Sequence, residues 1–571
     1  MKKETQKKLW AAGAIAGAAA ATAGVISGRK RRKVKRIEKE LKERDYGKKQ
    51  VYFIGGGLAS LAGAVYLIRD CNFHGGNIHI MEAMPKLGGS NDGAGDEAHG
   101  FICRGGRMLN EETYENFWDL MASIPSLEQP EISVKEEILD FDHTHPTHAQ
   151  ARLIDKDGNI LDVKSMGFNH EDRMALAKLM LTDEKELDRK TIEEWFEHTP
   201  HFFETNFWYM WQTTFAFQKW SSLFEFKRYM ERMIFEFSRI ETLEGVTRTP
   251  YNQYESVIRP LKEYLKGKGV RFETKCTVTD LDFADGDEIT VKAIHLEDDI
   301  TAKTIYLNDG DLCIMTNACM TDSATLGDFD TPAPEPEYRP VSGELWAKVA
   351  KKKQGLGNPE PFFGNPQQTN WESFTVTMKG TKMLQMLEDY SGNVPGSGAL
   401  MTFKDSNWLM SIVVAAQPHF KGQSEDTTIF WGYGLYTGAA GNYVQKPMKD
   451  CTGEEILYEL VRHLHFEEEW EEIRSSVINV IPCMMPYVDA QFQPRAMTDR
   501  PQVVPAGSTN FAMVSQFVEI PEDMVFTEEY SVRAARIAVY TLMGVQKKIC
   551  PVTPYKKDPK VLMKAIRTSY R

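Results

Sequence analysis

A glycine-rich segment near the start of the chain has the residue types and spacing that bind a dinucleotide pyrophosphate. Gly55, Gly57 and Ser60 follow an apolar run at residues 51–54 and precede a helical pattern at residues 61–67. The first glycine permits a tight turn, the second lets the backbone approach the phosphates, and a small third residue lets the helix pack close to the strand. The N-terminus of the helix then offers free N–H groups to the anion.

Two features after this turn support the same chemistry. A second apolar run at residues 78–81 ends in Glu82, whose carboxylate is placed to bond a ribose hydroxyl. Gly88, Gly89 and Ser90 then form a second small-residue turn near the expected phosphates. The alternative is a glycine-rich loop in an unrelated α/β protein. We predict an α/β fold whose Rossmann-like domain binds a dinucleotide.

Strand-like patterns are scattered widely along the chain, which predicts a nucleotide domain with long insertions. They occupy residues 270–282, 312–317 and 510–514, with a helical pattern at 527–544 and a Pro- and Glu-rich boundary at 332–340. The predicted division is a tail at 1–48, a nucleotide domain at 49–165, 251–330 and 501–550, an aromatic helical insertion at 166–250, a mixed substrate domain at 331–500, and a basic segment at 551–571.

Composition and charge narrow the class of protein. With 571 residues, 42% of them hydrophobic, the chain is long enough to bury more than one core. The net charge of −13 argues against a general nucleic-acid binder. The eight cysteines show no C-x-x-C and no regular spacing, so we expect neither a metal cluster nor a disulfide framework. This cysteine usage predicts that the protein lies in a reducing, cytoplasmic compartment.

The N-terminal segment differs from the acidic chain as a whole. Residues 9–28 carry no charge and are rich in Ala and Gly, and a basic block follows at residues 29–33. A segment of this length just crosses a bilayer core, although alanine contributes little transfer free energy. A cleaved signal peptide and a partly helical tail without a membrane role are the alternatives, but the basic block disfavours export. We predict a tether to the inner face of the cell membrane, with the basic block near anionic lipid.

Residues 195–237 are unusually rich in aromatic side chains. Such a segment is most often ordinary helical core, and the alternative is the wall of an apolar ligand pocket. Gln212, Thr213, Lys219 and Arg228 interrupt it with polar groups, which favours the pocket slightly. Periodicity alone does not separate the two interpretations.

A series of short motifs matches one known family in order and spacing along residues 49–555. They are Phe-Ile-Cys-Arg-Gly-Gly-Arg at 101–107, Ser-Ile-Pro-Ser-Leu-Glu at 123–128, Asn-Phe-Trp at 206–208, Tyr-Asn-Gln-Tyr at 251–254, Asp-Ser-Asn-Trp at 405–408, Gln-Pro-His-Phe at 417–420 and Phe-Thr-Glu-Glu-Tyr at 526–530. On these motifs the chain resembles the oleate hydratases, also called myosin-cross-reactive antigens. The resemblance implies an FAD-containing enzyme that adds water across a cis double bond of an unsaturated fatty acid.

Hydration of an alkene needs an acid that protonates one carbon and a base that directs water at the other. The resemblance assigns the acid to Tyr229 and places Gly106 and Arg107 near the flavin. Where the family motif R-G-G-R-E-M-E-N carries its water-orienting glutamate, this chain has Met108, which cannot accept a proton. No net redox change occurs, so the flavin would act by its charge and shape.

Three explanations of this departure stay open. Asn110, Glu111 or Glu112 contacts the water from a shifted loop, Arg107 and the flavin edge orient it without a carboxylate, or the hydratase activity has been lost. Glu111 and Glu112 could equally just begin a helix near Thr113, because acidic residues stabilise a helix N-terminus.

Further contacts complete the predicted site. Val278 and Thr527 are assigned to the cofactor site, and the resemblance implies that Gln253 and His419 bind the substrate carboxylate. The family pattern T-x-N-R-Q-P-H becomes Val-Val-Ala-Ala-Gln-Pro-His at residues 413–419. The lost donors predict a different head group, a different chain or weaker binding, and His419 could also be an ordinary surface histidine.

The prediction is a carbon–oxygen hydro-lyase that binds FAD and hydrates a fatty acid of the oleate or linoleate type. A flavin-dependent double-bond isomerase or oxidoreductase and a non-catalytic fatty-acid-binding protein are the alternatives, because Met108 leaves room for both. The basic segment at 555–571 either contacts an anionic membrane surface or is a solvated helical end. The sequence does not decide between a monomer and a homodimer.

Overall fold

The computed structural model describes residues 36, 39, 46–91, 93–104, 108–298, 301–338 and 340–571. Two sets of sequence predictions lie outside the described residues: the membrane tether at residues 9–28, and Gly106 and Arg107 of the cofactor loop. Within the described ranges, no helix is both long and apolar enough to cross a bilayer.

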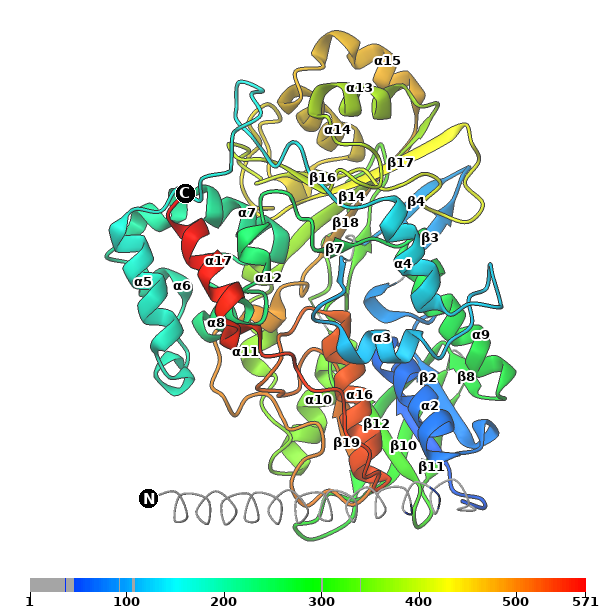
Figure 1. Cartoon of the computed structure of the whole chain (residues 1–571). Coiled ribbons are helices and arrows are strands. Elements are labelled where there is room, and N and C mark those ends of the chain that lie inside the picture. Colours follow the sequence, from blue (N-terminus) through cyan, green and yellow to red (C-terminus); the bar gives the residue numbers. More distant parts are fainter. Residues whose placement is uncertain are drawn as a thin grey trace, which may run out of the picture.

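A five-stranded parallel sheet forms the lower half of the molecule in Figure 1. Its strands, in order, are β19 (Phe511–Val514), β12 (Leu312–Thr316), β1 (Val51–Ile54), β2 (Ile78–Glu82) and β8 (Arg271–Thr274). All neighbouring pairs are parallel, and β1 and β19 are buried throughout, as parallel strands covered on both faces are. Strands from three distant parts of the chain therefore meet in one sheet, and the predicted α/β fold with a Rossmann-like domain is confirmed.

Helices pack over this sheet. The helix that follows the glycine turn, α2 (Leu58–Cys71), contacts α16 (Glu528–Leu542) and α9 (Arg259–Gly267), and α16 also contacts α3 (Glu115–Met121). Ser60 in the first turn of α2 is fully buried, which agrees with the need for a small residue where the helix packs closely.

The antiparallel sheet of β11 (Ala302–Tyr306), β10 (Val291–Asp298) and β9 (Cys276–Phe283) follows β8 in the chain. The sequence pattern predicted one strand over residues 270–282, whereas the structure contains two. Lys275 has a φ of 55°, in the left-handed region, so the chain leaves the parallel sheet there and enters the antiparallel one.

The upper half of the molecule is built on a second, seven-stranded sheet. Its order is β13 (Thr325–Leu326), β18 (Val477–Met485), β14 (Trp371–Lys379), β17 (Thr427–Gly434), β16 (Ser411–Val413), β15 (Leu400–Phe403) and β6 (Leu153–Ile154). All pairings are antiparallel except that of β15 with β6. Because β6 and β13 precede residue 331, this sheet extends beyond the segment assigned to the substrate domain from sequence.

The upper sheet contacts helices and also the strand that precedes the cofactor loop. Helices α13 (Lys382–Ser391), α14 (Gly453–His463) and α15 (Trp470–Ser476) lie above it in Figure 1. On another side, the hydroxyl of Thr375 in β14 accepts a hydrogen bond from the backbone N–H of Cys103, at 2.8 Å, in β4 (Gly100–Cys103). This contact joins the upper sheet to the polypeptide that leads into the cofactor loop.

A helical lobe at the left of Figure 1 holds α5 (His170–Leu181), α6 (Ile192–Trp195), α7 (Asn206–Phe215) and α8 (Leu223–Arg232), with α17 (Pro559–Ser569) beside it. Its aromatic side chains form core: the rings of Phe196 and Phe202 stack with centroids 3.8 Å apart. Others, including Phe215 and Tyr229, line a cavity. The aromatic segment is thus both core and pocket wall.

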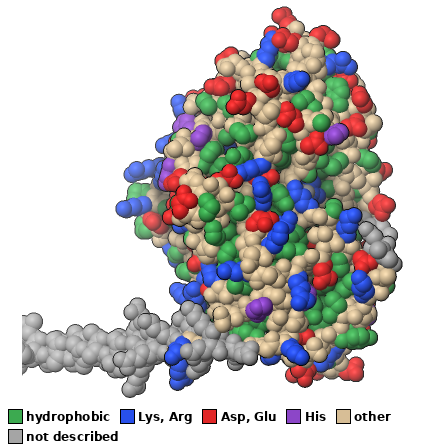
Figure 2. Space-filling view, turned by 90° about the vertical axis from the view of Figure 1, so that its right-hand side faces the viewer, with side chains coloured by type: hydrophobic (Ala, Val, Ile, Leu, Met, Phe, Trp, Pro, Cys, Tyr) green, Lys and Arg blue, Asp and Glu red, His purple; other side chains and the backbone are tan. Residues whose placement is uncertain are grey.

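Further strands and α-helices of the described chain are β3 (Gly93–Asp96), β5 (Leu109–Asn110), α4 (Val134–Thr144), β7 (Val246–Thr247), α10 (Val341–Lys352), α11 (Glu360–Phe363) and α12 (Pro366–Thr369). On the face drawn in Figure 2, basic and acidic side chains are interspersed over the described surface. That face has no extended basic stripe among its described residues, the feature that nucleic-acid binding uses.

Candidate functional site

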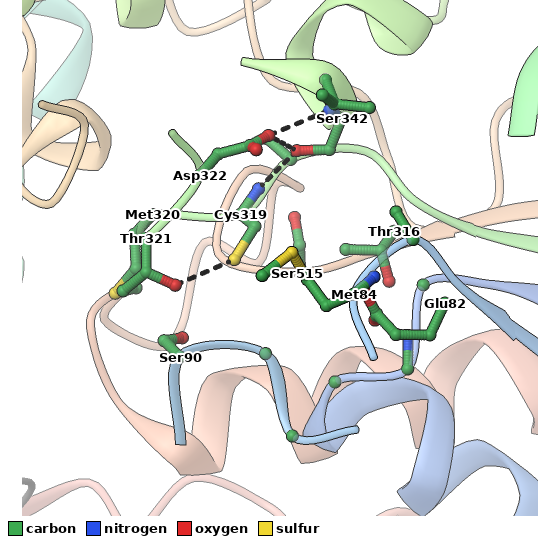
Figure 3. A pocket seen from close by; sticks show the side chains of 18 of the residues that line it. Glu82, Met84, Ser90, Thr316, Cys319, Met320, Thr321, Asp322, Ser342 and Ser515 are labelled. Atoms are coloured by element: carbon green, nitrogen blue, oxygen red, sulfur yellow. Dashed lines mark hydrogen bonds between the residues drawn. The ribbon is translucent and has the colours of Figure 1, made fainter. Parts of the chain in front are cut away.

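A cavity of about 510 Å³ lies at the carboxyl ends of the parallel strands, where ligands bind in open α/β sheets. Residues 55–57 after β1, Glu82 at the end of β2, and the turn at residues 88–90 line it. Figure 3 shows Glu82 and Ser90 in this cavity, together with residues 319–322, which follow β12. The structure therefore brings the two small-residue turns and the acidic residue together.

The glycine turn has two kinds of glycine. Gly55 has a φ of 94°, and a Cβ there would lie 2.9 Å from the side chain of Thr316, so the protein's own packing requires glycine. A Cβ at Gly57 would meet no described atom closer than the Cα of Gly89, at 3.9 Å. Packing therefore leaves the space beside Gly57 open to a ligand, as a backbone that approaches a pyrophosphate requires. Gly88 N–H donates to the carbonyl of Gly56, at 3.0 Å, and holds the two turns together.

Backbone hydrogen bonds hold the Glu82 carboxylate in place. One oxygen accepts from the N–H of Gly56, at 2.6 Å, and the other from the N–H of Met84, at 2.8 Å. Burial raises the pKa of Glu82 above its ordinary value, and these bonds oppose that shift. Each carboxylate oxygen can accept more than one hydrogen bond, so the group keeps capacity for a ligand hydroxyl.

Two more of the predicted cofactor residues line the same cavity. Val278 lies on β9, and Thr527 is the N-cap of α16, where its hydroxyl accepts from the N–H of Tyr530 at 3.2 Å. Ser60 does not line the cavity and instead packs inside α2.

Sequence reasoning missed the segment after β12. The carboxylate of Asp322 accepts from the hydroxyl of Ser342, at 2.5 Å, and from its N–H, at 2.9 Å, as Figure 3 shows. The hydroxyl of Ser342 also accepts from the N–H of Cys319, at 3.0 Å. The signal was present in the sequence, because residues directly after a parallel strand face this edge of the sheet.

A second cavity, of about 90 Å³, is mostly apolar. Its lining includes Tyr229 of α8, Met108, Phe215 and Trp371. It shares Phe526, Thr527 and Glu528 with the nucleotide cavity, so one wall separates the two spaces.

Tyr229 is held as a neutral phenol. Its side chain is 1% exposed, and its hydroxyl donates to the carbonyl of Val525 at 2.6 Å. Burial raises the pKa of Tyr229 well above its usual value, and nearby acidic groups act in the same direction. The phenol therefore keeps its proton at neutral pH, as a group that must deliver a proton to an alkene requires.

The fold separates the loop residues that the sequence offers in place of the family glutamate. Met108 lines the apolar cavity, and so does Asn110, which is buried. Glu111 is exposed, and Glu112 accepts from the guanidinium of Arg239 at 2.7 Å. Neither glutamate lines the nucleotide cavity or the apolar cavity.

A third, small cavity of about 40 Å³ brings Gln253 and His419 together. The carbonyl of His419 accepts from the backbone N–H of Asn252 at 2.9 Å, which ties the two loops. Burial, aided by the neighbouring Arg248, lowers the pKa of His419 to about 4, so the ring is neutral at physiological pH. The cavity shares Ser90 with the nucleotide cavity.

Arg248 is the residue of this third cavity that sequence reasoning missed. Its Nε and Nη2 are shielded from solvent and have no hydrogen-bond partner among the described residues. Burial lowers the pKa of Arg248 to about 10, which still leaves the guanidinium charged at neutral pH. The charge stands five positions before Gln253, but only the fold shows that it faces His419 rather than solvent.

One family model and two hydratases match most of the chain. The model of the MCRA family matches residues 48–540. A linoleate hydratase from Lactiplantibacillus plantarum is 40% identical over 566 residues, covering 92% of this chain and 99% of the relative. An oleate hydratase from Streptococcus pyogenes serotype M49 (strain NZ131) is 37% identical over 528 residues, covering 90% of this chain and 89% of the relative.

Solved structures are more distant. A putative protoporphyrinogen oxidase from Exiguobacterium sp. 255-15 has a TM-score of 0.49 at 14% identity, covering 88% of this chain and 100% of that chain. A CLA-producing fatty acid isomerase from P. acnes has a TM-score of 0.45 at 12% identity, covering 87% of this chain and 100% of that chain. These likenesses are too weak to bear on function. The family match and the two hydratase relatives extend over most of the sequence, and the chain belongs to the MCRA family.

Proposed function

We infer that this protein is a fatty acid hydratase, a hydro-lyase that adds water across a cis double bond of an oleate- or linoleate-type acid. The observation that carries this conclusion is Tyr229, a buried neutral phenol in an apolar cavity that shares a wall with a dinucleotide cavity. Membership of the MCRA family and relatives named linoleate hydratase and oleate hydratase support the same activity.

We propose FAD as the dinucleotide. Gly55 and Gly57 would lie along its pyrophosphate, Glu82 would bond its ribose, and Gly88 to Ser90 would close the turn around it. Val278 and Thr527 line the same space, and Gly106 and Arg107 are proposed to lie near the flavin. When bound, the flavin supplies a polar, rigid wall for the reaction and no net transfer of electrons.

The substrate carboxylate is proposed to lie in the third cavity. Gln253 and the neutral His419 offer hydrogen bonds there, and Arg248 offers a guanidinium whose Nε and Nη2 are shielded from solvent and bond no described residue. A carboxylate that accepts from these nitrogens would satisfy a buried charge, a strong and oriented contact. Arg248 therefore supplies a cation where residues 413–416 lack the polar side chains of the family pattern.

With the head group held, the double bond of the acid extends into the apolar cavity. Tyr229 then donates its phenolic proton to one alkene carbon, while the walls exclude bulk water from the cation that develops. In the cofactor loop, Asn110 and Arg107 are polar groups that could orient the attacking water. Glu111 and Glu112 are the carboxylates that the sequence offers in the same loop.

A labelled-water experiment tests the activity. We expect the purified protein with FAD and oleate or linoleate, in water enriched in heavy oxygen, to form a hydroxy acid that carries the label. A shifted double bond without label would identify an isomerase, and bound but unchanged acid would identify a fatty-acid-binding protein. Either of these results overturns the proposed hydratase.

A membrane tether at residues 9–28 remains part of the proposal, and the C-terminal helix α17 supports a lipid contact. Met563 and Ile566 of α17 are exposed, beside Lys560 and Lys564. We expect the full chain to co-sediment with vesicles that contain an anionic lipid and to do so less at high salt. A chain that stays in the supernatant with both anionic and neutral vesicles contradicts the tether. Sedimentation velocity separates a monomer from the homodimer.

A further inference from the structure

We propose that Glu236 orients the attacking water and accepts its proton, in the place that the family glutamate holds elsewhere. This assignment rests on the proposed hydratase function. It makes Glu236, which lies in the sequence far from the cofactor loop, the carboxylate partner of Tyr229.

The position of Glu236 meets the first requirement of a catalytic base. It begins a 3₁₀ turn, Glu236–Ser238, shortly after the end of α8, and its side chain lines the apolar cavity together with Tyr229 and Met108. Glu236 is 3% exposed. It therefore lies at the space where the alkene is proposed to bind, whereas Glu111 and Glu112 do not.

The two oxygens of this carboxylate have different surroundings. Oε1 accepts from Nδ2 of Asn110, at 3.1 Å, and from Nε and Nη2 of Arg239, at 3.0 and 2.5 Å. Oε2 is shielded from solvent and accepts no hydrogen bond from any described residue. Protein contacts thus orient the group through one oxygen and leave the other available.

A buried carboxylate oxygen without a hydrogen-bond partner is unfavourable, the more so when charged, unless a water satisfies it. The cavity of about 90 Å³ has room for a water molecule, which needs polar partners of this kind. A water that donates to Oε2 would stand in the same space as Tyr229, ready to attack the alkene. Hydration needs this arrangement of acid, water and base.

Gly245 and Asn110 lie against the carboxylate of Glu236. A Cβ on Gly245 would lie 1.6 Å from Oε1, so any larger residue there would displace the carboxylate. Nδ2 of Asn110, which donates to Oε1 of Glu236, also donates to the carbonyl of Gly245 at 2.8 Å. Asn110 lies two positions after Met108, so the loop that lost the glutamate contacts Glu236 directly.

Among the described residues, Glu528 is the other carboxylate that lines this cavity. One of its oxygens accepts from the amide of Asn91 at 2.5 Å, and the residue also faces the nucleotide cavity. Glu236 instead contacts Asn110 of the Met108 loop and does not line the nucleotide cavity. Burial raises the pKa of Glu236, with Arg239 opposing the shift, and a carboxylate with a raised pKa is a stronger base.

The step balances without a redox partner. The O–H bond of Tyr229 breaks and its proton forms a C–H bond with one alkene carbon. The water oxygen forms a C–O bond with the other carbon, and the proton that this water loses passes to Oε2 of Glu236. Return of that proton to the phenolate restores both groups.

The test compares Glu236→Gln with Glu112→Gln and with Glu231→Gln, a matched loss of charge at a residue of α8 that does not line this cavity. We expect Glu236→Gln to lower the rate of labelled hydroxy acid formation by roughly 10²–10⁴-fold, the range of general base catalysis, with flavin binding, fatty acid affinity and thermal midpoint near the parent's. The Glu231→Gln control should stay within a few-fold of the parent. The acid limb of the pH–rate profile should disappear in Glu236→Gln alone.

A second variant distinguishes the loss of a catalytic base from misfolding. In Glu236→Ala, formate should restore part of the activity, because the small acid can occupy the space of the lost carboxylate. Near-parental activity of Glu236→Gln, or a loss in Glu112→Gln alone, overturns the assignment. A loss in Glu236→Gln with an unchanged pH profile and no rescue by formate also overturns it and gives Glu236 a structural role. An inactive parent would instead overturn the proposed hydratase itself, so the two failures are distinct.

Discussion

At the scale of single residues, the site depends on polar groups kept in defined protonation states by burial. Tyr229 stays neutral because its surroundings disfavour the phenolate, and His419 stays neutral because they disfavour the imidazolium. Arg248 keeps its charge, and its Nε and Nη2 bond no residue in the described part of the chain. These states fit a proton donor at one end of the substrate and an anion receptor at the other.

Removal of the phenolic proton should stop catalysis without much loss of structure. In Tyr229→Phe we expect turnover to fall by roughly 10²–10⁴-fold, the contribution of a general acid. The carbonyl of Val525 loses one hydrogen bond, a change of about 1 kcal/mol. Hydroxy acid formation, flavin absorbance and the thermal midpoint measure the three effects. Activity within a few-fold of the parent would show that another group delivers the proton.

Removal of the Arg248 charge should weaken binding of the acid and spare binding of its ester. In Arg248→Gln we expect KM for the free fatty acid to rise by roughly 10–100-fold, as for a lost charged hydrogen bond, with a smaller effect on kcat. The methyl ester of the same acid should bind parent and variant alike. Arg259→Gln, on the surface of α9, is the control. Equal losses for acid and ester would give Arg248 a structural role only.

His419 should make stability depend on pH. Its pKa is about 4 in the folded protein and near 6.5 when unfolded, so the unfolded chain binds more protons between these values. Stability of the parent should therefore fall as pH drops through this window. In His419→Asn the fall in thermal midpoint between pH 7 and pH 4.5 should be smaller. Equal falls in both proteins would contradict the buried, neutral ring.

At the scale of elements, the sequence predicted best what depends on neighbours in the chain. The apolar run at 51–54 coincides with β1, and the run at 78–81 lies within β2, because buried parallel strands are continuous apolar segments. The break at Lys275 was missed, since nothing in the alternation shows that the backbone changes sheets there. Glu236 was missed for a related reason: it meets Asn110 across 126 positions, a contact that only the complete fold creates.

The turn between β1 and α2 allows a clean test of cofactor binding. In Gly57→Val the new side chain should occupy the space left for the pyrophosphate and abolish flavin binding, while the fold persists because the nearest described atom to the new Cβ is 3.9 Å away. Gly438→Val, at another open glycine, is the control. Absorbance of the purified protein and its circular dichroism spectrum measure both effects. Normal flavin content in Gly57→Val would place the nucleotide elsewhere.

At the scale of the whole molecule, three cavities meet around a few shared residues. The nucleotide and apolar cavities share Phe526 to Glu528, and the nucleotide and head-group cavities share Ser90 and Asn91. These residues come from opposite ends of the chain and meet through the hydrogen bond between Asn91 and Glu528. The proposed acid, cofactor and carboxylate receptor are therefore positioned by one assembly rather than by separate domains.

The shared wall at Phe526 to Glu528 has a thermodynamic consequence. Phe526 has a φ of 67°, an uncommon conformation for a bulky residue, and its N–H is held by the side chain of Gln516 at 2.6 Å. A ligand that orders this wall from one side changes the affinity for a ligand on the other side. Linkage requires the effect to be reciprocal: whatever factor the flavin adds to fatty acid affinity, the fatty acid adds to flavin affinity. Substrate would then retain the cofactor as much as the cofactor prepares the site for substrate.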